Sequence, residues 1–208
     1  VKIAVMAAKK ATDLPVAASM SFEQGRSLTG STPDIFADTM QNLGVDLIGT
    51  NCSAGPEGFV EVLEAMRPRL EKPLLMQPNA GLPILEMGET VFKLPPDPFA
   101  EQTGRLAAMG AYALGGCCGT TPAHISALRE RLANFVPLPP APELSDCVSI
   151  TSRSVSVTLS SRNELPMAVI GERINPTGKK QLTEELQAGE FTRALAMARE
   201  QLDAGAVV

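Results

Sequence analysis

Apolar positions along the first two thirds of the chain follow two alternating patterns. Short apolar runs, which are typical of buried strands, alternate with segments in which apolar residues recur every three or four positions, as on one face of a helix. The predicted strands are 14–22, 45–51, 73–77 and 111–114, and the predicted helices are 1–10, 32–43, 56–68, 97–109 and 121–135. This alternation predicts an α/β fold of βα units around a parallel sheet. Four units fit half of an eight-stranded barrel or a small open sheet.

The last third of the chain reads as a linker followed by a new α/β unit. Residues 135–145 carry four prolines and no helical period, which is typical of a semi-rigid linker. Residues 146–161 are rich in Ser, Val and Thr and predict a strand or hairpin. An apolar strand at 167–170 and helices at 179–187 and 190–204 are expected to follow. We therefore divide the chain into 1–134, a Pro/Ser-rich linker at 135–165, and the start of a second unit at 166–208.

Three other stretches complete the predicted layout. Residues 78–96 are rich in Gly and Pro and predict a long loop. The chain starts inside a helical pattern with no preceding capping residue. Residues 203–208 read as a helix stop followed by the first residues of a strand. We interpret the chain as a fragment.

Composition and charge narrow the class of protein. Apolar residues make up 44% and charged residues 20% of the 208 residues, so a core can form and disorder is excluded as the main state. The 18 basic and 23 acidic residues, without basic runs, argue against a nucleic-acid partner. We expect no membrane span, because the chain has no run of 18 apolar residues. We expect no signal peptide, because no charged segment followed by an apolar run opens the chain. Four cysteines are too few for a disulfide scaffold, so a cytoplasmic location is expected.

Three cysteines follow predicted strands. Cys52 comes directly after the strand at 45–51, and Cys117 and Cys118 follow the strand that ends near residue 114. The carboxyl ends of parallel strands meet at one edge, where α/β barrels place their active sites. Three thiolates suit Zn²⁺ with a fourth position open for substrate or water, which is typical of catalytic zinc. The glycines at 115, 116 and 119 would let the backbone bend so that neighbouring sulfurs reach one ion.

Other interpretations of the cysteines remain open at this point. A cysteine is often a small core residue, and Cys117 and Cys118 could simply pack inside a glycine-rich turn. The chain has no CxxC pair, so a zinc ribbon and a thioredoxin-type redox site fit poorly. Cys147 lies beyond the proline-rich linker, and we predict a free thiol without a role.

Four segments together resemble the homocysteine S-methyltransferase family. They are GRSLTG at 25–30, GTNCSAGP at 49–56, PNAG at 78–81 and GGCCGTTPAHI at 115–125. The resemblance implies that residues 1–134 form the C-terminal half, about strands 5–8, of a (β/α)8 TIM barrel. It also implies that Cys52, Cys117 and Cys118 are zinc ligands, with Asn79 as a weak fourth oxygen ligand when substrate is absent.

A second resemblance covers VIGERINPTG at 169–178, which is similar to the opening of the pterin-binding barrel of cobalamin-dependent methionine synthases. It implies that a second TIM barrel starts here and that Glu172 and Asn175 face a pterin. The implied cofactors of the intact protein are Zn²⁺, cobalamin and methyltetrahydrofolate. The implied partners are homocysteine and a cobalamin-binding module or corrinoid protein.

The expected function is zinc-dependent methyl transfer to the thiol of homocysteine, giving methionine. Two alternatives are a homocysteine methyltransferase with another donor, such as betaine, S-methylmethionine or a corrinoid protein, and a non-catalytic metal-binding fragment. We expect the chain alone to be marginally stable and inactive, because half a barrel leaves unpaired strand edges. We predict that His124 is a surface or helix-capping residue rather than a ligand, and that Asn51 supports the ligand loop by hydrogen bonding.

Overall fold

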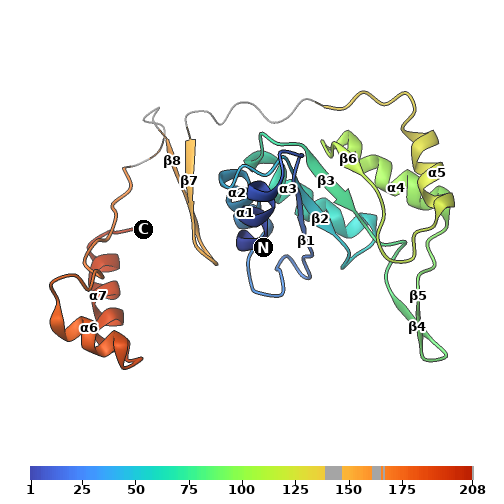
Figure 1. The fold of residues 1–208 in the computed structure, drawn as a ribbon. Helices are drawn as coiled ribbons and strands as arrows, with labels where there is room; N and C mark the ends of the chain where they lie inside the picture. The colour runs from blue at the N-terminus through green and yellow to red at the C-terminus, as the bar shows by residue number, and fades with distance from the viewer. Residues whose placement is uncertain (139–146, 161–164, 166, 208) are drawn as a thin grey trace. The chain divides into compact units, whose positions relative to one another are not determined.

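The structure is a computed structural model that describes residues 1–138, 147–160, 165 and 167–207 (Figure 1). These residues form two compact units. The first contains the described residues up to 138 together with 151–156, and the second contains 147–150 and the described residues from 157 onward. The first unit is an α/β structure around a parallel sheet, as the apolar pattern predicts.

The sheet of the first unit has four parallel strands in sequence order. The strands are β1 (Ala17–Met20), β2 (Leu47–Asn51), β3 (Leu74–Gln77) and β6 (Ala113–Leu114). Asn51 at the end of β2 lies opposite Gln77 at the end of β3, and Met76 lies opposite Leu114. The carboxyl ends of β2, β3 and β6 therefore reach the same edge of the sheet. Within the described residues, β1 and β6 each pair with one neighbouring strand.

Helices of the first unit fall where the three- to four-residue apolar spacing predicts them. They are α1 (Lys2–Ala11), α2 (Pro33–Asn42), η1 (Pro56–Phe59), α3 (Val60–Met66), η2 (Arg67–Arg69), α4 (Pro96–Ala108) and α5 (Pro122–Arg131). The predicted helix at 56–68 is split into a 3-10 turn, a short α-helix and a second 3-10 turn. Pro56 starts the first turn and Pro68 lies in the last one, since proline cannot supply the N–H bonds of a helix interior.

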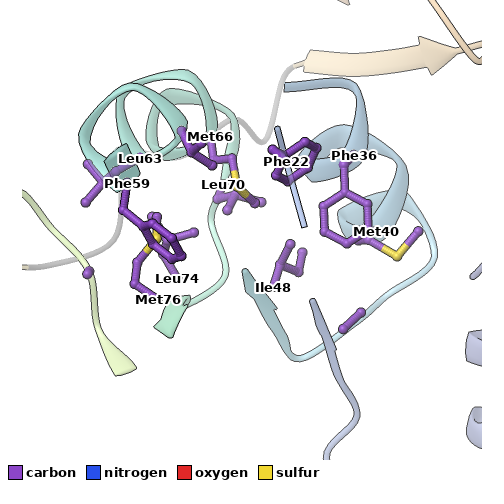
Figure 2. Packing of buried hydrophobic residues seen from close by; sticks show 14 of the residues in the cluster. Phe22, Phe36, Met40, Ile48, Phe59, Leu63, Met66, Leu70, Leu74 and Met76 are labelled. Atoms are coloured by element: carbon purple, nitrogen blue, oxygen red, sulfur yellow. The ribbon is translucent and has the colours of Figure 1, made fainter. Parts of the chain in front are cut away.

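The core of the first unit lies between the sheet and its helices. Ile48, Leu74 and Met76 are almost fully buried, and Figure 2 shows them with apolar side chains from α2 and α3. In β3, buried Leu74 and Met76 alternate with half-buried Leu75 and Gln77. Each buried side chain of this size contributes about 1.5–3 kcal/mol to folding. The same packing fixes the strand ends that carry the cysteines.

One predicted loop contains a hairpin. Residues 78–96 include β4 (Ile84–Glu86) and β5 (Glu89–Val91), which pair antiparallel. The turn residues Met87 and Gly88 both have positive φ, which two-residue hairpin turns require. Met is rare in that conformation, and most of the strand residues are exposed, so neither turn chemistry nor an apolar alternation marks the hairpin.

The hairpin and helices predicted for the last third of the chain are present. β7 (Cys147–Thr151) and β8 (Ser156–Ser160) form a two-stranded sheet, of which residues 151–156 belong to the first unit. α6 (Lys180–Gln187) and α7 (Thr192–Asp203) follow in the second unit. The predicted strand at 167–170 is wrong, because these residues form no ladder with any described strand. Among the described residues, one backbone bond, from the Val207 N–H to the Val169 oxygen, reaches this segment. A strand needs a paired neighbour, which apolar residues alone cannot supply.

Two further expectations concern the ends of this region. The chain leaves α7 after Asp203 as expected, but residues 206–207 form no strand, and residue 208 lies outside the described residues. Parts of the predicted linker, 139–146 and 161–164, also lie outside the described residues. A search of the described helices finds none with the length and apolarity needed to cross a membrane.

Candidate metal centre

Cys52, Cys117 and Cys118 come together at the carboxyl edge of the parallel sheet. Cys52 is the first residue after β2, and the other two follow the short strand β6. The sulfur of Cys118 lies 3.5 Å from that of Cys52 and 3.9 Å from that of Cys117. All three sulfurs lie within 4.8 Å of one another. The structure therefore brings together the three cysteines that the sequence singles out.

The arrangement of these sulfurs fits a zinc ion. Tetrahedral zinc with Zn–S bonds of about 2.3 Å places its sulfur ligands about 3.8 Å apart. The two closest sulfur separations lie on either side of that value. Cys118 is exposed and Cys52 and Cys117 are half-buried, so none of the three is a fully buried core residue. Exposure on one side is what an open fourth coordination position needs.

A strained turn directs Cys52 toward the other two cysteines. Cys52 and Ser53 both have positive φ, of 63° and 66°, a conformation that residues with a side chain seldom adopt. The Cys52 N–H donates to the Gln77 carbonyl at 3.1 Å, and the Ala54 N–H donates to the Cys52 carbonyl at 2.8 Å. Such strain costs roughly 1–3 kcal/mol per residue and is concentrated at functional sites.

One short segment, residues 77–80, joins the two cysteine loops through its backbone. Toward the Cys52 loop, the Gln77 carbonyl accepts from the Cys52 N–H, and the Asn79 N–H donates to the Ala54 carbonyl at 2.9 Å. On the other side, the Cys117 N–H donates to the Pro78 carbonyl at 2.8 Å. The Ala80 N–H also donates to the Cys118 carbonyl at 2.9 Å. The segment thus sets the distance between loops that are far apart in the sequence.

Asn79 adds a side-chain contact to this segment. It is 3% exposed, and its Oδ1 accepts from the Cys118 N–H at 3.0 Å. The same side chain hydrogen-bonds the Cys52 sulfur. These contacts orient both cysteines, and the expected role of Asn79 as a weak fourth ligand stays a prediction. Asn51 contacts the Ser19 hydroxyl at 2.7 Å with its Oδ1, so it braces the end of β2 from the neighbouring strand.

Two glycines around the cysteine pair are required by the space available. Gly119 has a φ of 75°, and a Cβ there would lie 2.3 Å from the Cβ of Phe92. A Cβ at Gly116 would lie 2.4 Å from a methyl carbon of Thr120. The expected sharp bend around Cys117 and Cys118 is therefore present, and it depends on residues that lack a side chain.

Neighbouring groups shift the pKa of Cys52 and that of Cys118 in opposite directions. Burial raises the pKa of Cys52, but hydrogen bonds from the Ser53 backbone and from the side chains of Cys118, Cys117 and Asn79 outweigh it, so the pKa of Cys52 is lowered. The pKa of Cys118 is raised to about 11, chiefly because its S–H donates to Cys52, with burial and the neighbouring thiols adding to the effect. Of Cys52 and Cys118, Cys52 therefore ionises first as the pH rises.

His124 caps a helix, as predicted, but it is not a surface residue. It is 6% exposed, and its Nδ1 accepts from the Thr121 N–H at 3.2 Å at the start of α5. Its Nε2 lies 2.9 Å from the Leu94 carbonyl, and its ring meets Phe99 edge to face. A polar residue is buried here because the capping bond and the loop bond satisfy both ring nitrogens.

The candidate residues of the second unit lie close to one another. The Asn175 side-chain nitrogen donates to the Glu172 carboxylate at 3.0 Å, and the Asn175 oxygen accepts from the Thr177 N–H. Both residues are exposed, and their role toward a pterin stays a prediction. Cys147 in β7 is a free thiol, as predicted.

The three cysteines lie within the part of the chain that a known family matches. A family model described as homocysteine S-methyltransferase matches residues 1–132. The methionine synthase of Mycobacterium tuberculosis is 34% identical over 212 residues, covering 99% of this chain and 17% of that protein. The methionine synthase of Mycobacterium leprae is 32% identical over 215 residues, covering 99% of this chain and 18% of that protein. The chain spans less than a fifth of these relatives. It belongs to the homocysteine S-methyltransferase family.

Proposed function

We propose that this chain carries the zinc centre for methyl transfer to homocysteine, giving methionine. The observation that carries the proposal is the convergence of three cysteine sulfurs at distances suited to one tetrahedral ion. The family supports homocysteine as the methyl acceptor. In the transfer, the substrate thiol loses its proton, a new S–CH₃ bond forms, and the bond between the methyl group and its donor breaks.

Each residue of the centre has a distinct role in this proposal. Cys52, Cys117 and Cys118 hold the ion as thiolates, and Asn79 keeps Cys118 and Cys52 in place. Zinc, when bound, lowers the pKa of the substrate thiol and orients it. Three thiolates leave the site with a charge of about 2 − 3 = −1, so the substrate sulfur stays electron-rich. The exposed side at Cys118 leaves room for the substrate.

The proposed donor system is methyltetrahydrofolate with cobalamin as the carrier. Its support is that the similarity to two methionine synthases continues beyond residue 132 to nearly the end of the chain. Glu172 and Asn175 would then hold the donor–acceptor edge of the pterin. A cobalamin-binding module would present the methyl group to the cysteine centre.

We also propose that the first unit is part of a (β/α)8 barrel. Parallel sheets normally have both faces covered, and closure into a barrel removes the unpaired edges of a sheet. Here β1 and β6 each have one strand neighbour among the described residues, and alternate residues of β3 are half-buried. Pairing of these two edges with further strands would close the sheet. The second unit would begin a second barrel.

Metal analysis of the purified chain under reducing conditions tests the proposed centre. We expect one zinc per chain in the wild type, none in Cys118→Ala, and one in the matched control Cys147→Ala, whose thiol lies outside the cluster. A folded wild-type chain that contains no zinc, or a Cys118→Ala chain that retains it, would contradict the proposal. Binding of homocysteine to the zinc form, seen by calorimetry, tests the acceptor separately.

A further inference from the structure

We propose that His124 is a positioning residue that holds the Cys117–Cys118 loop in the geometry for metal binding. This inference rests on the proposed zinc centre. His124 touches neither the cysteines nor Asn79 in the contacts described above. It acts through Thr121, whose backbone N–H and hydroxyl both contact Nδ1, and through the carbonyl of Leu94.

The two contacts define which ring nitrogen of His124 carries the hydrogen. The Thr121 backbone N–H can only donate, so Nδ1 accepts and is unprotonated. The Leu94 carbonyl can only accept, so Nε2 carries the hydrogen and donates it at 2.9 Å. The neutral imidazole therefore works as an acceptor at one end and a donor at the other.

These contacts close a ring of hydrogen bonds that includes Cys118 of the proposed metal centre. Leu94 accepts from His124, and its own N–H donates to the Ala80 carbonyl at 3.0 Å. Ala80 in turn donates to the Cys118 carbonyl at 2.9 Å. The backbone from Cys118 to Thr121 and the hydrogen bond between Thr121 and His124 complete the ring. Removing the Leu94 bond opens the ring on the side of Cys118, whereas the Thr121 end stays joined to His124 through the backbone at the start of α5.

Helix capping alone does not explain a histidine at this position. His124 is the third residue of α5, where the capping box normally has Glu or Gln. Glu supplies the acceptor for the Thr121 N–H but no donor for Leu94. The terminal amide of Gln carries both an acceptor oxygen and a donor N–H, as the two nitrogens of the neutral imidazole do. The hydrogen bond from His124 to the Leu94 carbonyl therefore distinguishes a positioning role of His124 from helix capping alone.

The test compares His124→Gln, His124→Glu and His124→Leu in the full chain, with Ser126→Ala as a control. Ser126 is an exposed residue of the same helix whose hydroxyl contacts Glu130, outside the ring. The readouts are zinc affinity by chelator competition and the absorption spectrum of the Co²⁺ form, which reports tetrahedral thiolate coordination. The unfolding temperature of each metal-free chain is measured in parallel.

We expect His124→Gln and the Ser126→Ala control to keep the wild-type zinc affinity and Co²⁺ spectrum. His124→Glu and His124→Leu should lower the zinc affinity by about 10–100-fold, which is the usual effect of losing a residue that supports metal ligands. Both should also alter the Co²⁺ spectrum. Equal affinity and spectra in wild type and His124→Glu would overturn the positioning role, even if the unfolding temperature falls. A wild-type chain that binds neither metal would overturn the proposed centre, and the positioning role with it.

Discussion

The side-chain oxygen of Asn79 lies 3.0 Å from the backbone nitrogen of Cys118, although 39 residues separate them in the sequence. Asn79 is almost fully buried, so this bond is shielded from water and its loss would leave a polar group without a partner. The contact ties the end of β3 to the loop after β6, and with it the orientation of one proposed ligand.

Replacement of Asn79 tests this contact. Asn79→Ala removes the acceptor, and we expect zinc affinity to fall by about 10–100-fold. Asn79→Asp keeps the acceptor for the Cys118 N–H but loses the amide donor to Cys52 and adds a negative charge beside the thiolates, so we expect it to lower the affinity as well. Chelator competition measures both variants. An Asn79→Ala chain with wild-type affinity would show that the contact does not support the centre.

The pKa values predict how the thiols react with iodoacetamide when metal is absent. Because the pKa of Cys52 is lowered, Cys52 becomes a thiolate before Cys118, which stays protonated until the pH approaches its pKa of about 11. Peptide mass mapping after brief alkylation at pH 8 should find label on Cys52 and little on Cys118. Added zinc should protect both. Preferential labelling of Cys118 would contradict the assigned order.

The same shift of Cys118 predicts how the stability of the metal-free chain depends on pH. Its folded pKa is raised above the ordinary value of 9.0, so the proton is held more tightly in the folded state. The resulting stabilisation is complete below pH 9 and is lost as pH rises toward 11. Urea unfolding at several pH values should show a decline over this range that is reduced in Cys118→Ala. An equal decline in both chains would assign the effect to other groups.

Gly119→Ala should disrupt the cysteine loop far more than Gly88→Ala. Both glycines have positive φ, so each substitution costs about 1–2 kcal/mol in backbone strain. A Cβ at Gly88 meets open space, whereas a Cβ at Gly119 collides with Phe92. We therefore expect Gly119→Ala to lose zinc as well as stability, and Gly88→Ala to keep its zinc. Metal analysis and urea unfolding distinguish the two, and equal effects would refute the steric argument.

Ser53→Gly should stabilise the chain. Glycine relieves the strain of the positive φ at this residue and makes the unfolded chain more flexible, leaving a net gain of roughly 0.5–1 kcal/mol. Urea unfolding measures the gain. Zinc affinity should not change, because the Ser53 side chain is outside the set of proposed ligands. A loss of stability would mean that the Ser53 side chain makes a contact that outweighs the strain.

The sequence predicts the elements of the first unit well because apolar spacing reports burial against the sheet. It also identifies Cys52, Cys117 and Cys118, since each follows a strand and strand ends of a parallel sheet converge. The β4–β5 hairpin and the buried state of His124 could not be predicted in the same way. The hairpin has little buried surface, and the burial of His124 depends on Leu94, a residue 30 positions away.

Other features of the site leave no trace in the spacing of residues. The positive φ of Cys52 and Ser53 occurs at residues that do not favour that conformation, so the strained turn is visible only in the structure. The failed strand at 167–170 shows the opposite case. Its apolar residues satisfy the pattern, but pairing depends on a neighbour that local sequence does not specify.

Residues 77–80 hold the loops of all three cysteines by backbone bonds, and this has a consequence for the motions of the centre. If the segment detaches, both loops lose their support in the same event, so the thiols become accessible together rather than singly. The amide protons of Cys52, Cys117 and Ala80 would then exchange with solvent at similar rates. A metal held by the three sulfurs would then lose its support from both loops in the same event.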